Sequence, residues 1–164
     1  MLEALAYKRD FEPDEDGALA AGLAWPRVLD LFAGSGGLGI EALSRGAQHA
    51  MFVEQDRASA RIIDANLRAA DVAERAVVQV GPVQLILPRL SGRFDLVFAD
   101  PPYADGGAVQ TTTALLRRAG LLTRDSVVVL EQAGEHEAPA DVGPLPLAST
   151  RRHGRTRVSL YAGW

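Results

Sequence analysis

The feature that most constrains this chain is an apolar run that passes directly into a glycine-rich turn. Residues 28–33 are Val-Leu-Asp-Leu-Phe-Ala, and residues 34–39 are Gly-Ser-Gly-Gly-Leu-Gly. The apolar run predicts a buried strand over Val28–Phe32, and the glycines predict a tight turn that opens a helix over Gly36–Arg45. Such a turn lets a ligand lie against bare backbone, so it is a candidate cofactor site.

Strands and helices alternate along the rest of the chain. Further strands are expected at Ala50–Glu54, Ala76–Val80, Phe94–Ala99 and Ser126–Glu131. Further helices are expected at Arg57–Ala70, in a short segment ending near Leu90, and at Ala108–Ala119. Two last strands, 147–152 and 157–162, flank a turn-like His153-Gly154 pair, and the proline-rich stretch 139–146 is expected to be loop. This alternation predicts an α/β fold with a mostly parallel, seven-stranded sheet, helices on both faces and a closing antiparallel hairpin.

Length and charge suggest one domain with an acidic leading segment. The chain has 164 residues, and we expect an N-terminal helix and acidic loop in 1–24 before a single domain in 25–164. Residues 1–24 hold six acids and two bases, which equals the net charge of −4. That acidity argues mildly against a nucleic-acid partner, but four arginines near the end could meet phosphates or form a solvated face. They are Arg151, Arg152, Arg155 and Arg157.

Cysteine usage and hydropathy exclude several other classes. The chain has no cysteine and only three scattered histidines, so neither a disulfide nor a metal site is expected. No apolar stretch is long enough to cross a membrane, and no basic lead precedes an apolar segment. We therefore expect a cytoplasmic protein without a membrane partner.

An acid at the end of the second strand complements the glycine turn. Gly34, Gly36 and Gly39 fit the pattern G-x-G-x-x-G, which is weak evidence by itself. Glu54 lies twenty positions after Gly34, where a carboxylate can accept hydrogen bonds from both ribose hydroxyls of an adenosine. Dinucleotides and S-adenosylmethionine both fit this geometry. Asp30 favours the second, because a carboxylate inside an apolar strand is costly unless it meets a cation such as an amino-acid ammonium. The alternatives are a purely structural turn and a solvated strand-end acid.

A second informative run, Asp100-Pro101-Pro102-Tyr103, follows the apolar strand 94–99. Two prolines fix the backbone and remove two N–H donors, so this corner presents carbonyls and a carboxylate. A planar ring with an exocyclic amine fits it: Tyr103 would stack on the ring while Asp100 and the Pro101 carbonyl accept the hydrogens of the amine. These acceptors would favour the nucleophilic amine and stabilise its developing positive charge. The alternative is a rigid loop with a surface tyrosine.

Together these motifs resemble those of a known family, the bacterial small-subunit ribosomal RNA guanine-N2 methyltransferases (the RsmD family). The resemblance covers roughly residues 25–164 and rests on the segments 32–36, 38–46, 52–54, 100–103 and 152–156. It implies a class I, Rossmann-like, S-adenosylmethionine-dependent fold that releases S-adenosylhomocysteine. It also implies a flipped guanine as substrate, within ribosomal RNA or a small-subunit assembly intermediate.

The resemblance further assigns residues to the two halves of the site. The expected catalytic residues are Asp100, Pro101, Pro102 and Tyr103. The expected cofactor-binding residues are Asp30, Phe32, Ala33, Gly34, Ser35, Gly36, Glu54, Gln55, Pro82 and Val83. Gly81-Pro82-Val83 stands where the family often carries an acid and a small residue, so any adenine contact there is expected to be apolar or through the backbone.

Several alternatives stay open at this stage. The family's basic N-terminal arm does not precede the first strand in this sequence, so we expect cofactor affinity to be kept and RNA affinity to be weak. The amine pocket equally suits adenine in DNA or a small molecule, and the glycine turn also suits a nucleotide-binding oxidoreductase. A binding module without turnover is a further alternative. Asn66, in an amphipathic helix, is expected to hydrogen-bond locally.

Overall fold

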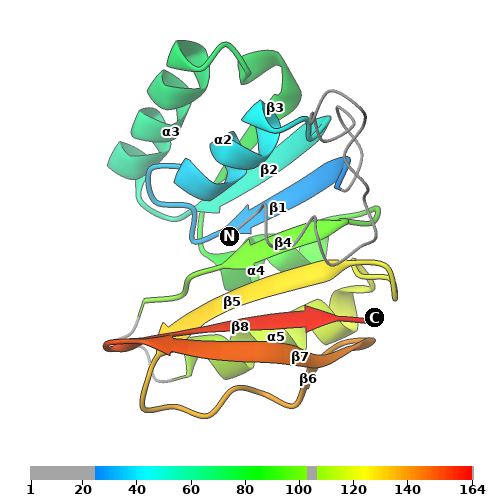
Figure 1. Ribbon diagram of the computed structural model, residues 1–164. Helices are drawn as coiled ribbons and strands as arrows, with labels where there is room; N and C mark the ends of the chain where they lie inside the picture. The colour runs from blue at the N-terminus through cyan, green and yellow to red at the C-terminus, as the bar shows by residue number, and fades with distance from the viewer. Residues whose placement is uncertain (1–24, 103–106, 164) are drawn as a thin grey trace, which may run out of the picture.

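The computed structural model describes residues 25–102 and 107–163. The helix and acidic loop expected in residues 1–24 lie outside the described residues, and so does Tyr103. The described residues form one eight-stranded sheet with the order β3-β2-β1-β4-β5-β8-β7-β6 (Figure 1). The α/β fold predicted from the sequence is confirmed.

The first five strands of the chain form the parallel part of the sheet. They are β1 (Arg27–Leu31), β2 (His49–Glu54), β3 (Ala76–Val80), β4 (Leu96–Ala99) and β5 (Val127–Ala133). β1 pairs in parallel with both β2 and β4, so the chain builds outward to β3 and then returns to the other side of β1. In sheets of this kind ligands bind at the carboxyl ends of the strands where the order reverses, here the ends of β1, β2 and β4.

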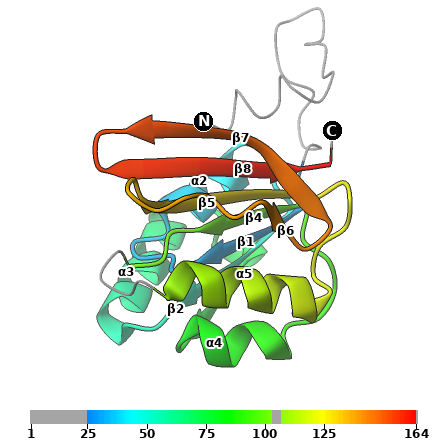
Figure 2. The ribbon, with the colours of Figure 1, turned by 90° about the horizontal axis from the view of Figure 1, so that it is seen from below.

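Helices cover both faces of this sheet, which explains why its central strands are mostly apolar. α2 (Gly37–Ser44) and α3 (Arg57–Ala69) pack on one face, where Ile63 and Leu67 join Phe52 in an apolar cluster. α4 (Val83–Ile86) and α5 (Ala108–Ala119) lie together on the opposite face (Figure 2). The 3-10 turns η1 (Ala73–Arg75) and η2 (Leu87–Arg89) complete the helical segments. Over the described ranges no helix has the length and apolar character needed to cross a bilayer.

The remaining strands run antiparallel. They are β6 (Asp141–Val142), β7 (Leu145–His153) and β8 (Thr156–Ala162). β8 inserts between β5 and β7 and is antiparallel to both, so the predicted closing hairpin is β7–β8.

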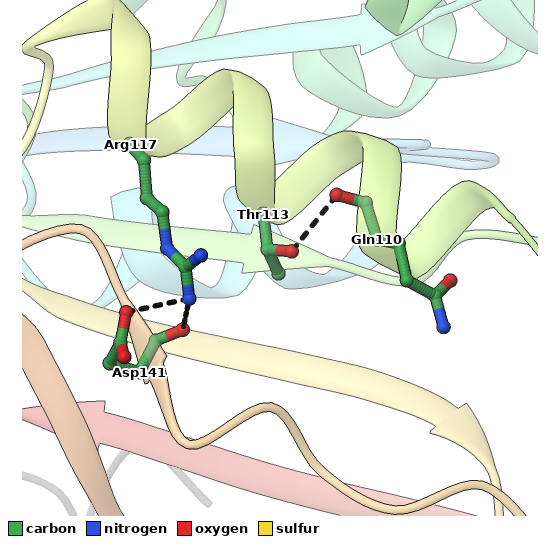
Figure 3. Close-up of polar contacts among 4 residues, drawn as sticks. All are labelled: Gln110, Thr113, Arg117 and Asp141. Carbon is green, nitrogen blue, oxygen red and sulfur yellow. Dashed lines mark hydrogen bonds and ion pairs between the residues drawn. The ribbon is translucent and has the colours of Figure 1, made fainter.

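The predicted number of seven strands is wrong by one, because β6 lies in the stretch 139–146 that we expected to be loop. Asp141 and Val142 pair with Pro146 and Leu145. Arg117 of α5 fixes this short strand: its Nη2 donates to the Asp141 carbonyl at 2.8 Å and lies 2.6 Å from Asp141 Oδ1 (Figure 3). One turn earlier, Thr113 Oγ1 donates to the Gln110 carbonyl. A strand of two residues is too short to show an alternating pattern in the sequence. Its formation depends on tertiary contacts such as those of Arg117.

Candidate active site

The glycine turn begins one residue earlier than the sequence suggests. Phe32 has a φ of 59° and is followed by Gly34 and Gly36 with φ of 57° and 82°, so the backbone is repeatedly left-handed. Only glycine adopts this conformation without a steric cost. The Ala33 N–H donates to the Val53 carbonyl at 3.1 Å, and the Gly36 N–H donates to the Ala33 carbonyl at 2.7 Å. The turn is therefore held against the end of β2.

Beneath the turn, the carboxylate of Asp30 is buried in β1. Only 2% of Asp30 is exposed, and its Oδ2 accepts a hydrogen bond from the Gly39 N–H at 2.9 Å. A Cβ on Gly39 would stand 2.7 Å from Cζ of Phe52, so this position requires glycine for close packing. Burial raises the pKa of Asp30 to about 7; the Gly39 N–H opposes this rise, and the charges of Asp100 and Glu54 add to it. A cation arriving beside Asp30 would favour its charged form.

Glu54, at the end of β2, joins the turn to the start of α3. Its Oε2 accepts from the Gly34 N–H at 2.8 Å, and its Oε1 accepts from the Asp56 N–H at 2.8 Å. Asp56 in turn caps α3 by accepting from the Ser59 N–H. Each carboxylate oxygen has two acceptor positions, so Glu54 keeps one on each oxygen for a ligand.

The hydrogen bond of Asn66 is not the local one that the sequence suggested. Its Nδ2 does not bond within its own helix but donates to the Ser35 carbonyl in the glycine turn, at 2.9 Å. Ile63, one helical turn earlier, contacts the same turn, since a Cβ on Gly36 would stand 3.1 Å from its Cγ2. The spacing of three residues between Ile63 and Asn66, which puts both on one helix face, was the signal available in the sequence.

The Asp100 corner follows β4. The Asp100 N–H lies 3.5 Å from the Leu31 carbonyl, Pro101 is buried and Pro102 is exposed. Asp100 itself keeps an exposed face, while partial desolvation and then the charge of Glu131 on β5 raise its pKa to about 6. The predicted stacking residue Tyr103 lies outside the described residues.

A cleft of about 200 Å³ brings the two motifs together. It is lined by Phe32, Val53, Glu54, Gln55, Val83, Asp100 and Pro102. Val53 was not among the predicted residues, because an apolar residue inside a strand carries no sign of a binding role. The remaining predicted residues that the structure describes do not line this cleft: they form the glycine turn, lie beneath it or adjoin the cleft walls. They are Asp30, Ala33, Gly34, Ser35, Gly36, Pro82 and Pro101.

A second hollow of about 400 Å³ adjoins the cleft at Gln55 and reaches Arg57 and Arg61 on α3 and Gly81 after β3. In the described part of the chain, no group of three or more acidic or histidine side chains is arranged to hold a metal ion.

An open sheet of this order, with the glycine turn and the strand-end acid at the point where the order reverses, is the fold of the class I methyltransferases.

Comparison with known proteins narrows this class. The family model described as "Conserved hypothetical protein 95" matches residues 17–162. The chain is 36% identical over 138 residues to YlbH of Bacillus subtilis, provisionally named as an rRNA methyltransferase, covering 82% of this chain and 74% of that protein. It is 31% identical over 135 residues to Ribosomal RNA small subunit methyltransferase D of Escherichia coli K12, covering 82% of this chain and 67% of that protein.

A solved structure of a conserved hypothetical protein from Streptococcus pyogenes agrees with these matches. It superimposes with a TM-score of 0.77 at 38% identity, covering 84% of this chain and 86% of that one. The chain belongs to the family of conserved hypothetical protein 95, the RsmD family, and the resemblance noted from the sequence is confirmed.

Asp30→Asn is expected to stabilise the protein at neutral and higher pH. The pKa of Asp30 rises on folding from 3.8 to about 7, so between these values the folded protein binds a proton that the unfolded chain has lost. Stability from this group is therefore fully present at low pH and is lost as pH rises through 7. Asparagine keeps an acceptor for the Gly39 N–H without the charge, so we expect a gain of about 1–3 kcal/mol above pH ~7.

Urea unfolding of both proteins between about pH 4 and pH 8 measures this difference. Asp71→Asn, a substitution at an exposed aspartate, is the matched control and should follow the wild-type curve. Parallel curves for wild type and Asp30→Asn would contradict the assignment.

Proposed function

We propose that this chain uses S-adenosylmethionine to methylate the exocyclic N2 amine of a guanine in small-subunit ribosomal RNA. The observation that carries the proposal is that Glu54 and Asp100 line the same cleft. One is suited to the ribose of the donor and the other to the hydrogens of the amine. The names of the Bacillus subtilis and Escherichia coli relatives support ribosomal RNA as the substrate. A ribosomal substrate in turn supports a cytoplasmic location for the proposed reaction.

The residues of the cleft fit S-adenosylmethionine. Glu54 retains two acceptor positions for ribose hydroxyls, and Phe32, Val53 and Val83 offer apolar walls. Asp30 lies beneath the turn as a buried carboxylate whose pKa is raised by burial and by the charges of Asp100 and Glu54, so a cation beside it would favour its ionised form. When bound, the donor supplies a methyl group made electrophilic by its sulfonium. Ammonium binding beside Asp30 would release the proton that this carboxyl holds near neutral pH.

At the amine of the substrate, Asp100 is the proposed hydrogen-bond acceptor and source of negative charge. The lone pair of an aromatic amine is delocalised into its ring, so the amine is a poor nucleophile. Acceptors at Asp100 and the Pro101 carbonyl would align its hydrogens, return the lone pair to nitrogen and stabilise the positive charge on it. Asp100, or water, then takes the proton. Flipping the base costs a few kcal/mol, which stacking on Tyr103 would offset in part.

The test is methyl transfer by the purified chain. We expect label from tritiated S-adenosylmethionine to enter protein-free small-subunit ribosomal RNA, or the assembled particle, and to appear as N2-methylguanosine after digestion to nucleosides. Label in N6-methyladenosine would move the proposal to another base. Incorporation of label into DNA would contradict the proposal. The absence of any incorporation, together with a nicotinamide-dependent absorbance change, would contradict it as well.

A further inference from the structure

The tip of the β7–β8 hairpin is a basic surface that the methyl-transfer chemistry does not use. From residue 142 onward the chain carries four arginines and no Asp or Glu. Residues 151–155 are all exposed, and Arg151, Arg152 and Arg155 form no ion pair with any residue that the structure describes. Among the described residues, the side chain of Arg152 donates to the Gly154 carbonyl alone. We call these three arginines the arginine hairpin.

Strand register places the arginine hairpin at the edge of the sheet that holds the cleft. Ala99, the last residue of β4, is level with Leu130 of β5, and Leu130 pairs with Ser159 of β8. β5 continues to Ala133, which pairs with Thr156 at the hairpin tip. At ~3.3 Å per residue the tip stands about 10 Å beyond the end of β4. Figures 1 and 2 both show the tip projecting on the side where β5 ends.

The hairpin tip is held in place before any partner arrives. The Gly134 N–H donates to the Arg155 carbonyl at 2.8 Å, and Arg157 Nη2 donates to the Gly134 carbonyl at 3.1 Å. Gly134 packs tightly against the tip, because a Cβ there would stand 3.0 Å from Arg152 Nε and 3.2 Å from the Arg155 carbonyl oxygen. The turn uses Gly154 with a φ of 59°. A fixed backbone lowers the entropy lost when these side chains bind.

We propose that the arginine hairpin binds the phosphates of the RNA strand that flank the target base. This inference rests on the proposed function and adds a contact surface to it. A strand whose base enters the cleft would run its backbone along the carboxyl edge of the sheet, from which the hairpin projects. Guanidinium forks match phosphate oxygens in a bidentate manner. The exposed acids Glu135 and Glu137 follow β5 at the same edge. The three arginines outnumber these two acids, so the hairpin contributes net positive charge there.

The decisive variant is Arg151→Gln/Arg152→Gln/Arg155→Gln. Its matched control, Arg68→Gln/Arg118→Gln/Arg124→Gln, removes the same charge at the opposite edge: the last turns of α3 and α5 and the loop before β5. Filter binding of protein-free small-subunit ribosomal RNA across a range of KCl concentrations compares them. Three lost contacts to a single strand should reduce the slope of log K against log salt by about 2, and weaken binding ~10- to 100-fold at low salt. The control should change binding less than about threefold.

Equal losses in the two triple variants, or an unchanged salt slope in the hairpin variant, would overturn the inference. Weaker binding to assembled particles without weaker binding to protein-free RNA would also overturn it and indicate an acidic protein surface instead. Arg155→Gln alone should reduce the salt slope by about one third as much as the triple hairpin variant. The two triple variants should keep wild-type affinity for S-adenosylmethionine, as measured by calorimetry. Hairpin-dependent RNA binding without methyl transfer would support this inference and contradict the proposed function. Methyl transfer to ribosomal RNA with an unchanged salt slope in the hairpin variant would support the proposed function and contradict this inference.

Discussion

Asp100→Asn is expected to lower the turnover number for RNA methylation by about 10²- to 10⁴-fold. The substitution keeps the size of the side chain and its place on the cleft wall. It replaces one acceptor oxygen by an NH₂ group, which faces the amine with a donor, and it removes the negative charge that stabilises the positive charge developing on nitrogen. Affinity for S-adenosylmethionine should change less than about tenfold, because Asp100 acts on the amine in this proposal. Single-turnover kinetics with labelled donor separate the two effects.

The wild-type pH profile provides an independent check on the same residue. The pKa of Asp100 is raised to about 6. Only the ionised carboxylate is free to take the amine proton and to stabilise the positive charge on nitrogen. Turnover at saturating donor should therefore fall as pH drops through about 6, rather than through the ordinary aspartate value near 4. Asp71→Asn, at an exposed site, should retain the wild-type profile and rate. An acid limb near pH ~4, or full activity in Asp100→Asn, would remove Asp100 from the mechanism.

Glu54→Gln is expected to weaken binding of S-adenosylmethionine by about 100-fold. Both Glu54 oxygens already accept backbone N–H groups, from Gly34 and Asp56 at 2.8 Å. A glutamine amide must turn its NH₂ toward one of these donors, which breaks that bond and removes one acceptor from the ribose site. Calorimetry with S-adenosylhomocysteine measures the loss without requiring turnover.

The control for Glu54→Gln is Glu41→Gln, which changes an exposed acid whose partner is Arg45 on the same helix. It should leave cofactor affinity unchanged. Urea unfolding should show Glu54→Gln less stable by about 1–2 kcal/mol, because a backbone donor of the turn is left unpaired. Cofactor affinity within about threefold of wild type, with stability lowered, would reduce Glu54 to a structural role.

Elements with clear ends were predictable from the sequence. The predicted bounds of β3 (Ala76–Val80) and α5 (Ala108–Ala119) match the structure. α5 ends at Gly120, whose φ of 64° is the left-handed stop that the glycine suggests. β1 was predicted one residue too far along the chain, because Phe32 is apolar like a strand residue while its backbone is already left-handed. Side-chain chemistry does not reveal such a conformation.

The meeting of the two motifs followed from topology. Glu54 and Asp100 were predicted to end parallel strands, and carboxyl ends of parallel strands share an edge. The contacts that shape the site were not predictable: Glu54 bonding to Gly34 and Asp56, and Asn66 bonding to Ser35, join side chains to distant backbone and leave no periodic pattern. The sequence left a methyl donor and a dinucleotide as alternatives, and family membership favours the first.

The place of β8 in the sheet has a consequence for synthesis on the ribosome. Val127–Leu130 of β5 are buried, and β8 is their neighbour on one side, although it follows β5 by more than twenty residues. Until Thr156–Ala162 emerges, the nascent chain carries an unpaired apolar strand at its open edge. That interval is where we expect co-translational aggregation to compete most strongly with folding, and where a holdase chaperone would protect the chain.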